Sequence, residues 1–179
     1  MTALQTETGV PTGTWAVDAV HSKVGFSVNH LGVSTFRGSF GLIDGALDAD
    51  GLRGTADVAS VAIDEPGLRG HLLSPEFFDA ERHPELRFRS REIRVEGGAV
   101  WVDGEIEIKG VTRPLALRGT ISGPVENPYG KVVLGLELAG VVDRRDFGLD
   151  WNAPLPGGGL TLGNEVAITG ELELVRVEG

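Results

Sequence analysis

The sequence contains no cysteine, and this absence removes several classes of chemistry. Without thiols the chain can form no disulfide bond, has no cysteine nucleophile and offers no cysteine ligand to a metal. Histidine is scarce too, with four in 179 residues, and no His-Glu-x-x-His pair is present. A zinc site would therefore need ligands that only folding could bring together, and we expect no metal centre.

Basic residues are also few, with Lys+Arg 16 against Asp+Glu 26 and a formal net charge of −10. Nucleic acid is not an expected partner, because phosphate binding needs a basic surface. No run of 18 apolar residues is present, so no transmembrane helix is predicted. The N-terminal segment lacks the basic, apolar and small-residue regions of a signal peptide, which favours a cytoplasmic location.

Glycine, in contrast, is abundant, and the 27 glycines separate short runs in which apolar and polar residues alternate. Residues 105–109 and 134–139 show this period of two clearly. Such runs predict antiparallel strands that turn one face inward, as in a barrel. The Gly97-Gly98 pair predicts a tight hairpin. We expect residues 1–13 to form a loose arm and residues 14–179 to fold as one all-β domain.

One segment breaks the period and predicts a helical insertion around residues 66–82. Ser74, Pro75 and Glu76 have the residue types of an N-cap and the first two positions of a helix. Pro84 would end this helix, and residues 67–73 are expected to form a helical turn before it. An insertion here could cover one mouth of a barrel.

The segment DAVHSKVGFSVNHLGVSTFRGSF, residues 18–40, carries the most specific pattern in the chain. Val24, Phe26, Val28 and His30 have a spacing of two, so they share one face of a strand. An imidazole at the end of an apolar row is unfavourable unless it finds a hydrogen-bond partner. Either the fold or a ligand must supply that partner, which makes His30 the best polar candidate for a binding site.

This segment resembles the start of the YceI-like family, which carries an Asp-x-x-His-Ser-x-Val-x-Phe-x-Val-x-His-Leu pattern followed by Arg-Gly. Three further blocks resemble the family in the expected order: HLLSPEFFDAERHPELRF (71–88), GEIEIKGVTRPLAL (104–117) and DRRDFGLDWN (143–152). The resemblance implies an eight-stranded antiparallel, lipocalin-like barrel whose elongated cavity binds an isoprenoid or another long amphiphile. It implies no settled catalytic role, is compatible with a homodimer, and includes many exported relatives.

Aromatic side chains dominate the large apolar area, and an eight-stranded barrel is just wide enough to hold one small ligand. The side chains expected to contact a lipid tail are Phe26, Val28, Phe36, Phe40, Phe77, Phe78, Phe88, Trp101, Phe147 and Trp151. The head group would meet His30 or, as weaker candidates, His21, Arg37 and Arg145. For both arginines, an ion-paired surface position is an equally good interpretation.

Three functions follow, and the sequence favours the first. It is non-catalytic binding of a polyisoprenoid, isoprenoid quinone or fatty-acid derivative, for carriage, storage or sequestration, with no other cofactor. The second is a closed β scaffold with a filled core that binds a protein partner. The third is a minor hydrolytic or lyase activity near His21 and His30. Asp18, His21 and Ser22 have the residue types of a triad, but residues 21 and 22 face opposite sides of a strand, so Asp18 or Ser22 more readily orients the His21 ring.

Overall fold

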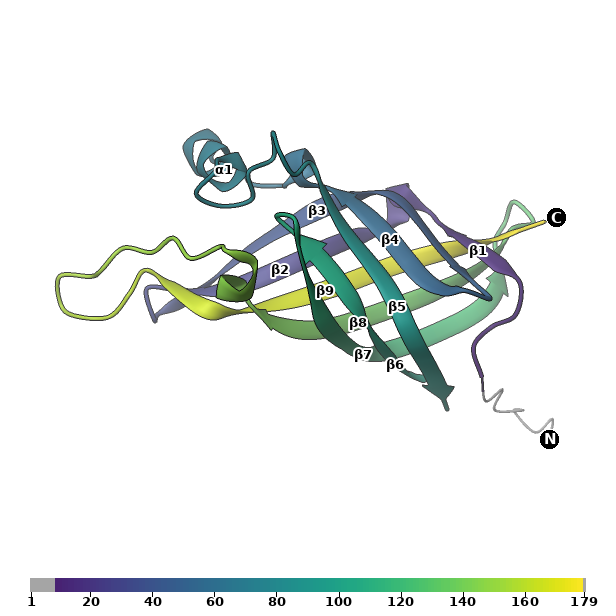
Figure 1. The fold of residues 1–179 in the computed structure, drawn as a ribbon. Coiled ribbons are helices and arrows are strands. Elements are labelled where there is room, and N and C mark those ends of the chain that lie inside the picture. Colours follow the sequence, from purple (N-terminus) through teal and green to yellow (C-terminus); the bar gives the residue numbers. More distant parts are fainter. Residues whose placement is uncertain (1–8, 179) are drawn as a thin grey trace.

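The structure, a computed structural model, describes residues 9–178 and is a closed antiparallel barrel of eight strands (Figure 1). The predicted all-β barrel is therefore confirmed. The strands are β1 Thr14–Val17, β2 Lys23–His30, β3 Ser34–Asp48, β4 Gly51–Asp57, β5 Glu85–Glu96, β6 Ala99–Ile108, β7 Val111–Glu126, β8 Val132–Asp143 and β9 Leu162–Val177.

The nine labelled strands form an eight-stranded barrel because β1 and β2 together act as one interrupted strand. Both pair antiparallel with β9, and the short 3₁₀ turn η1, Ala19–His21, separates them. The long strand β3 pairs with β2 in its first half and with β4 and β1 in its second half. A register shift between Leu42 and Asp44 lies near this change of partner, as expected where a strand bends to close a barrel.

The Gly97-Gly98 hairpin is confirmed, since it joins β5 to β6. The two glycines have φ values of 57° and 83°, the left-handed backbone that a two-residue hairpin turn requires. Lys109 and Gly110 make the same kind of turn between β6 and β7, with φ values of 51° and 75°. Tight turns of this kind hold neighbouring strands in register around the barrel.

The helical insertion is present, but the predicted helix start at Ser74 is wrong. Helix α1 spans Pro66–Leu73, with Glu65 as its N-cap and Ser74 as its C-cap. The Glu65 carboxylate accepts from the amide of Gly67 at 3.0 Å, and Pro66 occupies the first helical position. A residue with a capping side chain precedes a proline at both ends of α1, as Glu65-Pro66 and as Ser74-Pro75. The helix starts at the first of these pairs.

After α1 the chain turns back onto the helix and does not start a second one. The amides of Phe78 and Ala80 donate to the carbonyls of Leu72 and Leu73, both at 3.0 Å. These bonds use carbonyls at the helix C-terminus that would otherwise lack partners. The segment around Phe77 and Phe78 is thereby held beside α1 at one end of the barrel.

The core runs along the barrel axis and includes the fully enclosed side chains of Trp15, Leu134 and Leu174. The Trp15 indole N–H donates to the Thr12 carbonyl at 3.1 Å, and the Arg176 guanidinium lies 4.8 Å from the Trp15 ring centroid. Of the predicted arm, residues 1–8 lie outside the described residues. Among residues 9–178 no helix is both long and apolar enough to cross a bilayer.

Two excursions leave the barrel at the same end (Figure 1). One contains α1, between β4 and β5. The other follows β8 and contains the 3₁₀ turn η3, Arg144–Phe147, and a long loop that returns at β9. A third short 3₁₀ turn, η2, spans Val58–Ser60. The two excursions place side chains from distant parts of the sequence over one mouth of the barrel.

Candidate ligand-binding cavity

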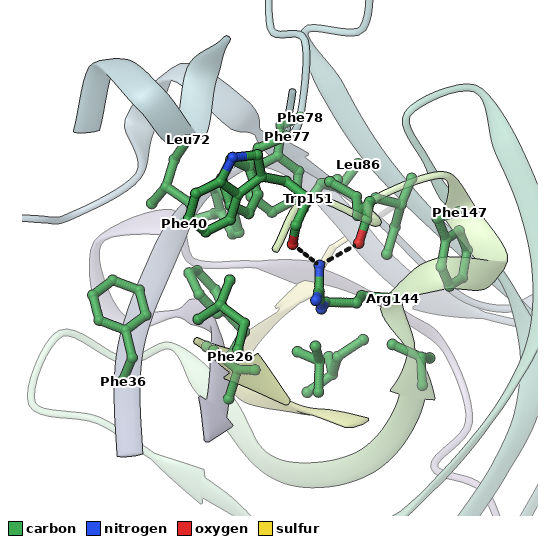
Figure 2. A pocket seen from close by; sticks show the side chains of 18 of the residues that line it. Phe26, Phe36, Phe40, Leu72, Phe77, Phe78, Leu86, Arg144, Phe147 and Trp151 are labelled. Carbon is green, nitrogen blue, oxygen red and sulfur yellow. Dashed lines mark hydrogen bonds between the residues drawn. The ribbon is translucent and has the colours of Figure 1, made fainter. Parts of the chain in front are cut away.

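A cavity of about 220 Å³ lies at the end of the barrel covered by α1 and η3 (Figure 2). Its walls come from β2, β3, β5, β6, β8 and β9, and from the α1 and η3 regions. Apart from His30, His71, Arg144 and Thr161, the described side chains that line it are apolar. An apolar cavity with a few polar groups is the usual form of a small-molecule site.

Four phenylalanines form one wall of this cavity. Phe26 comes from β2, Phe36 and Phe40 from the inward face of β3, and Phe78 from the segment after α1. The ring centroids of Phe26 and Phe40 are 5.5 Å apart, and those of Phe40 and Phe78 are 5.3 Å apart. These spacings allow tilted and edge-to-face packing, so the wall is an aromatic cluster that spans barrel and insertion.

A second aromatic group surrounds His71, which also lines the cavity. The imidazole lies edge-on to Phe77, with centroids 4.8 Å apart, and edge-on to Trp151 at 4.9 Å. Its Nε2 lies 2.6 Å from the exposed carboxylate of Glu76, which fixes the orientation of the ring. Trp151 belongs to the loop after η3, so this group joins the two excursions across the mouth.

Arg144 is the charged residue of the cavity, and only 5% of it is exposed. Its Nε donates to the Gly163 carbonyl at 2.8 Å, and its Nη1 donates to the carbonyls of Leu149 at 2.6 Å and Trp151 at 2.8 Å (Figure 2). Burial lowers the pKa of Arg144, but a guanidinium remains protonated at neutral pH. Arg144 therefore anchors the loop that carries Trp151.

A second cavity of about 90 Å³ continues the first along the barrel. Val24, Leu86, Ile106 and Ile168 line both cavities, so the two spaces lie next to each other on either side of these four aliphatic side chains. The deeper cavity is lined mostly by aliphatic residues of the barrel strands. Together these adjoining cavities make up a mostly apolar channel. Its deeper part is also lined by Thr169, Arg53 and Arg87, and both arginines are exposed and paired with carboxylates.

The structure brings most of the predicted tail-contacting residues together. The cavity at the mouth is lined by Phe26, Val28, His30, Phe36, Phe40, Phe77, Phe78, Phe147 and Trp151. Phe88 lines the deeper cavity. Trp101 lies apart from both cavities, because it alternates with the inward residues Val100 and Val102 and packs under Arg94, 4.4 Å from its ring centroid.

The weaker head-group candidates do not line the channel either. Arg37 is exposed on β3. Arg145 is exposed and binds the Asp143 carboxylate, with Nη2 to Oδ2 at 2.6 Å, and this guanidinium lowers the pKa of Asp143 to about 2. The ion-paired interpretation of Arg145 therefore matches the structure, and its neighbour Arg144 enters the cavity.

Arg144 and His71 line the cavity but were not predicted as site residues, although one signal in the sequence points to Arg144. The inward residues of β8 follow even numbers, from Leu134 through Leu138 to Val142, and Arg144 continues this alternation. For His71 the sequence holds no such signal, because its position depends on how the segment after α1 folds back.

His21 lies on the outside of the barrel beside Asp18. The Asp18 Oδ2 atom is 2.8 Å from His21 Nδ1, so the predicted role of Asp18 in orienting this ring is confirmed. Ser22 instead bonds to the backbone of Glu173, whose amide donates to its hydroxyl at 2.9 Å. Donor atoms of Asp18, His21 and Glu173 lie within 4.8 Å of one another, an arrangement that the spacing along the chain did not predict.

The Asp18–His21 pair should give a small pH dependence of stability. The hydrogen bond lowers the pKa of Asp18 below its ordinary 3.8 and raises the pKa of His21 above its ordinary 6.5. The stabilisation is therefore full between these two ordinary values. It is lost as pH rises through the raised pKa of His21 and as pH falls through the lowered pKa of Asp18.

We expect His21→Gln to reduce the urea midpoint slightly at pH 5, where the imidazole is charged in the folded protein. The same substitution should have a smaller effect at pH 9. Equal effects at both pH values would show that the ion pair contributes nothing to stability.

The model of the YceI-like domain matches residues 15–174 of this chain. The chain belongs to the YceI-like family. A relative, UPF0312 protein plu2095 of Photorhabdus laumondii, is 31% identical over 134 residues, which cover 71% of this chain and 70% of that protein. The family resemblance carried by the four sequence blocks is thus confirmed.

Two solved structures share the barrel. The YCEI protein of Campylobacter jejuni superposes with a TM-score of 0.70 at 24% identity, over 84% of this chain and 90% of that one. A domain from Saccharophagus degradans described as polyisoprenoid binding superposes with a TM-score of 0.69 at 12% identity, over 91% of this chain and 98% of that one. At these identities the likeness shows the fold.

Proposed function

We propose that this YceI-like protein binds a long-chain amphiphile non-catalytically, with the tail in the channel and the polar head at the covered mouth. The observation that carries the proposal is the channel itself, two adjoining and mostly apolar cavities, of which the one at the covered mouth also holds His30, His71 and Arg144. The Saccharophagus degradans neighbour supports a polyisoprenoid or a similar lipid as the ligand class. Carriage, storage and sequestration are all compatible with such a site.

The energetics support a tail-driven mode of binding. Each methylene moved from water into an apolar cavity contributes about 0.8 kcal/mol. A tail of about ten such groups would offset the cost of ordering the ligand and leave micromolar or tighter affinity. Few polar contacts are then needed, which matches a lining that is aromatic and aliphatic over most of its area.

The polar groups at the mouth support binding over turnover. Two nitrogens of Arg144 are occupied by backbone carbonyls, and His71 is held by Glu76. Groups engaged in this way orient walls and loops, and they do not form the nucleophile and base pair of a hydrolase. The open channel also argues against a barrel filled by its own side chains.

Tryptophan substitutions test the proposal, because one tryptophan lines the cavity and another lies outside it. We expect geranylgeraniol to change the intrinsic fluorescence of the protein on binding. Trp151→Ala should weaken this binding about 30-fold, since an aromatic wall worth about 2 kcal/mol is lost. The measurement is a fluorescence titration at protein concentrations below the dissociation constant.

Trp101→Ala is the matched control, because Trp101 packs under Arg94 and lines neither cavity. It should leave the dissociation constant unchanged within about twofold. If both substitutions weaken binding equally, the ligand does not enter this cavity. If geranylgeraniol, farnesol and palmitoleic acid all fail to bind the unmodified protein, the proposed function is wrong.

A further inference from the structure

The end of the barrel that holds the larger cavity carries a surface without formal charge. Asp, Glu, Lys and Arg make up 23% of the chain, yet none of them occurs in residues 24–36 or in residues 151–164. The first segment includes the turn between β2 and β3, and the second includes the loop that leads from η3 into β9. We call the turn 31–33 and the loop 151–161 together the uncharged tip.

Large apolar side chains of the uncharged tip are exposed to solvent. Val33 is 83% exposed, Leu160 is 52% exposed and Leu31 is 39% exposed. Leu31 also has a φ of 59°, a left-handed backbone that leucine rarely adopts and that glycine or asparagine adopts more easily. A partly exposed leucine in this conformation lowers the stability of the fold, which points to a role other than folding.

Backbone hydrogen bonds hold the two segments of the uncharged tip together. The Leu31 amide donates to the Thr161 carbonyl at 2.8 Å, which joins the turn to the loop. Within the loop the Leu155 amide donates to the Gly159 carbonyl at 3.0 Å, and the Thr161 amide donates to the Ala153 carbonyl at 2.9 Å. Figure 1 shows this loop projecting beyond the barrel at the end that carries α1. Backbone groups that are already bonded in this way can leave water without a large penalty.

The uncharged tip borders the mouth of the channel. His30 directly precedes the turn and Thr161 ends the loop, and both residues line the larger cavity. Leu68 of α1 lines the same cavity and is 37% exposed, so it faces both the cavity and solvent. A ligand that enters the channel beside Leu68 therefore passes close to the exposed apolar side chains of the tip.

We propose that the uncharged tip docks on the surface of a neutral phospholipid bilayer, where the channel exchanges its amphiphile with the membrane. The exchange rests on the proposed function, whereas docking depends on the tip alone. Apolar side chains bind a membrane by entering the boundary between head groups and acyl chains. A charged side chain would oppose this entry, and the net charge of −10 disfavours an anionic membrane surface.

A bilayer fits the uncharged tip better than a protein partner does. Interfaces between proteins have polar rims and form about one hydrogen bond per 100–200 Å². The polar side chains of the tip already have partners inside the protein, since Asn152 donates to the Leu162 carbonyl and Thr161 donates to the Ala153 carbonyl, both at 2.8 Å. A long amphiphile is also poorly soluble in water, so a bilayer is the phase from which it enters the channel.

The test of docking compares two variants with the same chemical change. Val33→Glu places a carboxylate in the tip, and Val20→Glu places one on η1 at the other end of β2, where the valine is 86% exposed. Both variants make the net charge more negative by the same amount, so general repulsion is matched. We expect the unmodified protein to float with phosphatidylcholine vesicles. Val33→Glu should lower its partition coefficient by about fivefold or more, and Val20→Glu should leave it unchanged within about twofold.

Leu31→Asn is a second variant that protects the test against a folding defect. Asparagine tolerates the left-handed backbone at this position, so the barrel should remain folded while an apolar contact is lost. Vesicle binding should therefore weaken without a loss of urea stability. Unchanged vesicle binding in both Leu31→Asn and Val33→Glu would overturn the docking of the tip.

Exchange is measured in the same vesicles with anthroyloxy-labelled palmitic acid. The rate of transfer to the unmodified protein should rise with vesicle concentration, and Val33→Glu should lower it by about fivefold or more without changing the equilibrium affinity for the probe. A rate that is independent of vesicle concentration would mean transfer through water and would overturn the exchange.

The outcomes separate docking from ligand binding. If the unmodified protein does not float with the vesicles, or if both glutamate variants weaken flotation equally, docking is overturned and the proposed function stands. A dimer in analytical ultracentrifugation that Val33→Glu dissociates would assign the tip to a second copy of the chain and would also overturn docking. If the labelled fatty acid does not bind at equilibrium, the exchange is overturned, and flotation still decides whether the tip docks.

Discussion

Replacing Gly170 with leucine should weaken binding of a long amphiphile about 100-fold. Gly170 faces inward on β9 and lines the deeper cavity, and a Cβ atom added there would meet no other atom within 4 Å. A leucine would therefore occupy the space proposed for the end of the tail. Excluding about four methylenes at about 0.8 kcal/mol each gives about 3 kcal/mol, or two orders of magnitude in affinity.

Chain length distinguishes this blockage from a general defect. A ligand shorter by about four carbons should bind Gly170→Leu and the unmodified protein equally well, since its tail ends before the blocked region. The control is Gly135→Leu, because Gly135 lies on the outer face of β8 and its added Cβ would meet only Ser122, at 3.9 Å. Uniform weakening for short and long ligands would mean that the tail does not reach the deeper cavity.

Replacing Gly119 with alanine should destabilise the barrel by about 3 kcal/mol or more. Gly119 on β7 faces Leu138 on β8, and a Cβ atom there would lie 1.6 Å from the carbonyl oxygen of Glu137. The obstacle is backbone, so no side chain can rotate away and the two strands must separate. Overpacking at this level lies at the upper end of measured effects. Urea unfolding followed by circular dichroism would measure the change.

The matched substitution is Gly135→Ala on the facing strand, where the added methyl finds only ordinary contact. It should change the unfolding midpoint little, since a strand position gains slightly from alanine over glycine. Similar midpoints for the two variants would mean that β7 and β8 are not held as close as the geometry requires.

Much of the barrel could be predicted from alternation alone. The runs around Ile106 and Leu136 have a period of two, and they form the inward faces of β6 and β8. Alternation tells which side chains point inward, so it also identified Phe26, Val28 and His30 as a set. Trp101 was predicted as a ligand contact because it is a large aromatic residue. The alternation itself places it on the outer face, between the inward residues Val100 and Val102.

The excursions were harder to predict, because short segments there obey local capping and tertiary contacts. Serine is a preferred N-cap residue and glutamate is not, so the sequence favoured Ser74 as the start of the helix. In the structure Glu65 is the N-cap, and Ser74 is the C-cap where Phe78 and Ala80 return onto the end of α1. Arg144 and Arg145 are consecutive and carry the same charge, so residue type alone does not tell which of them enters the cavity. The structure separates them, since one follows the inward alternation of β8 and the other turns back to Asp143.

Native mass spectrometry of freshly purified protein tests the central claim most directly. If the channel holds a long amphiphile, the spectrum should contain a species with one discrete added mass that disappears after organic extraction. The extracted protein should regain an added mass on incubation with polyprenyl phosphate, isoprenoid quinone or long-chain fatty acid. A bare mass that stays bare after all three incubations would contradict the account.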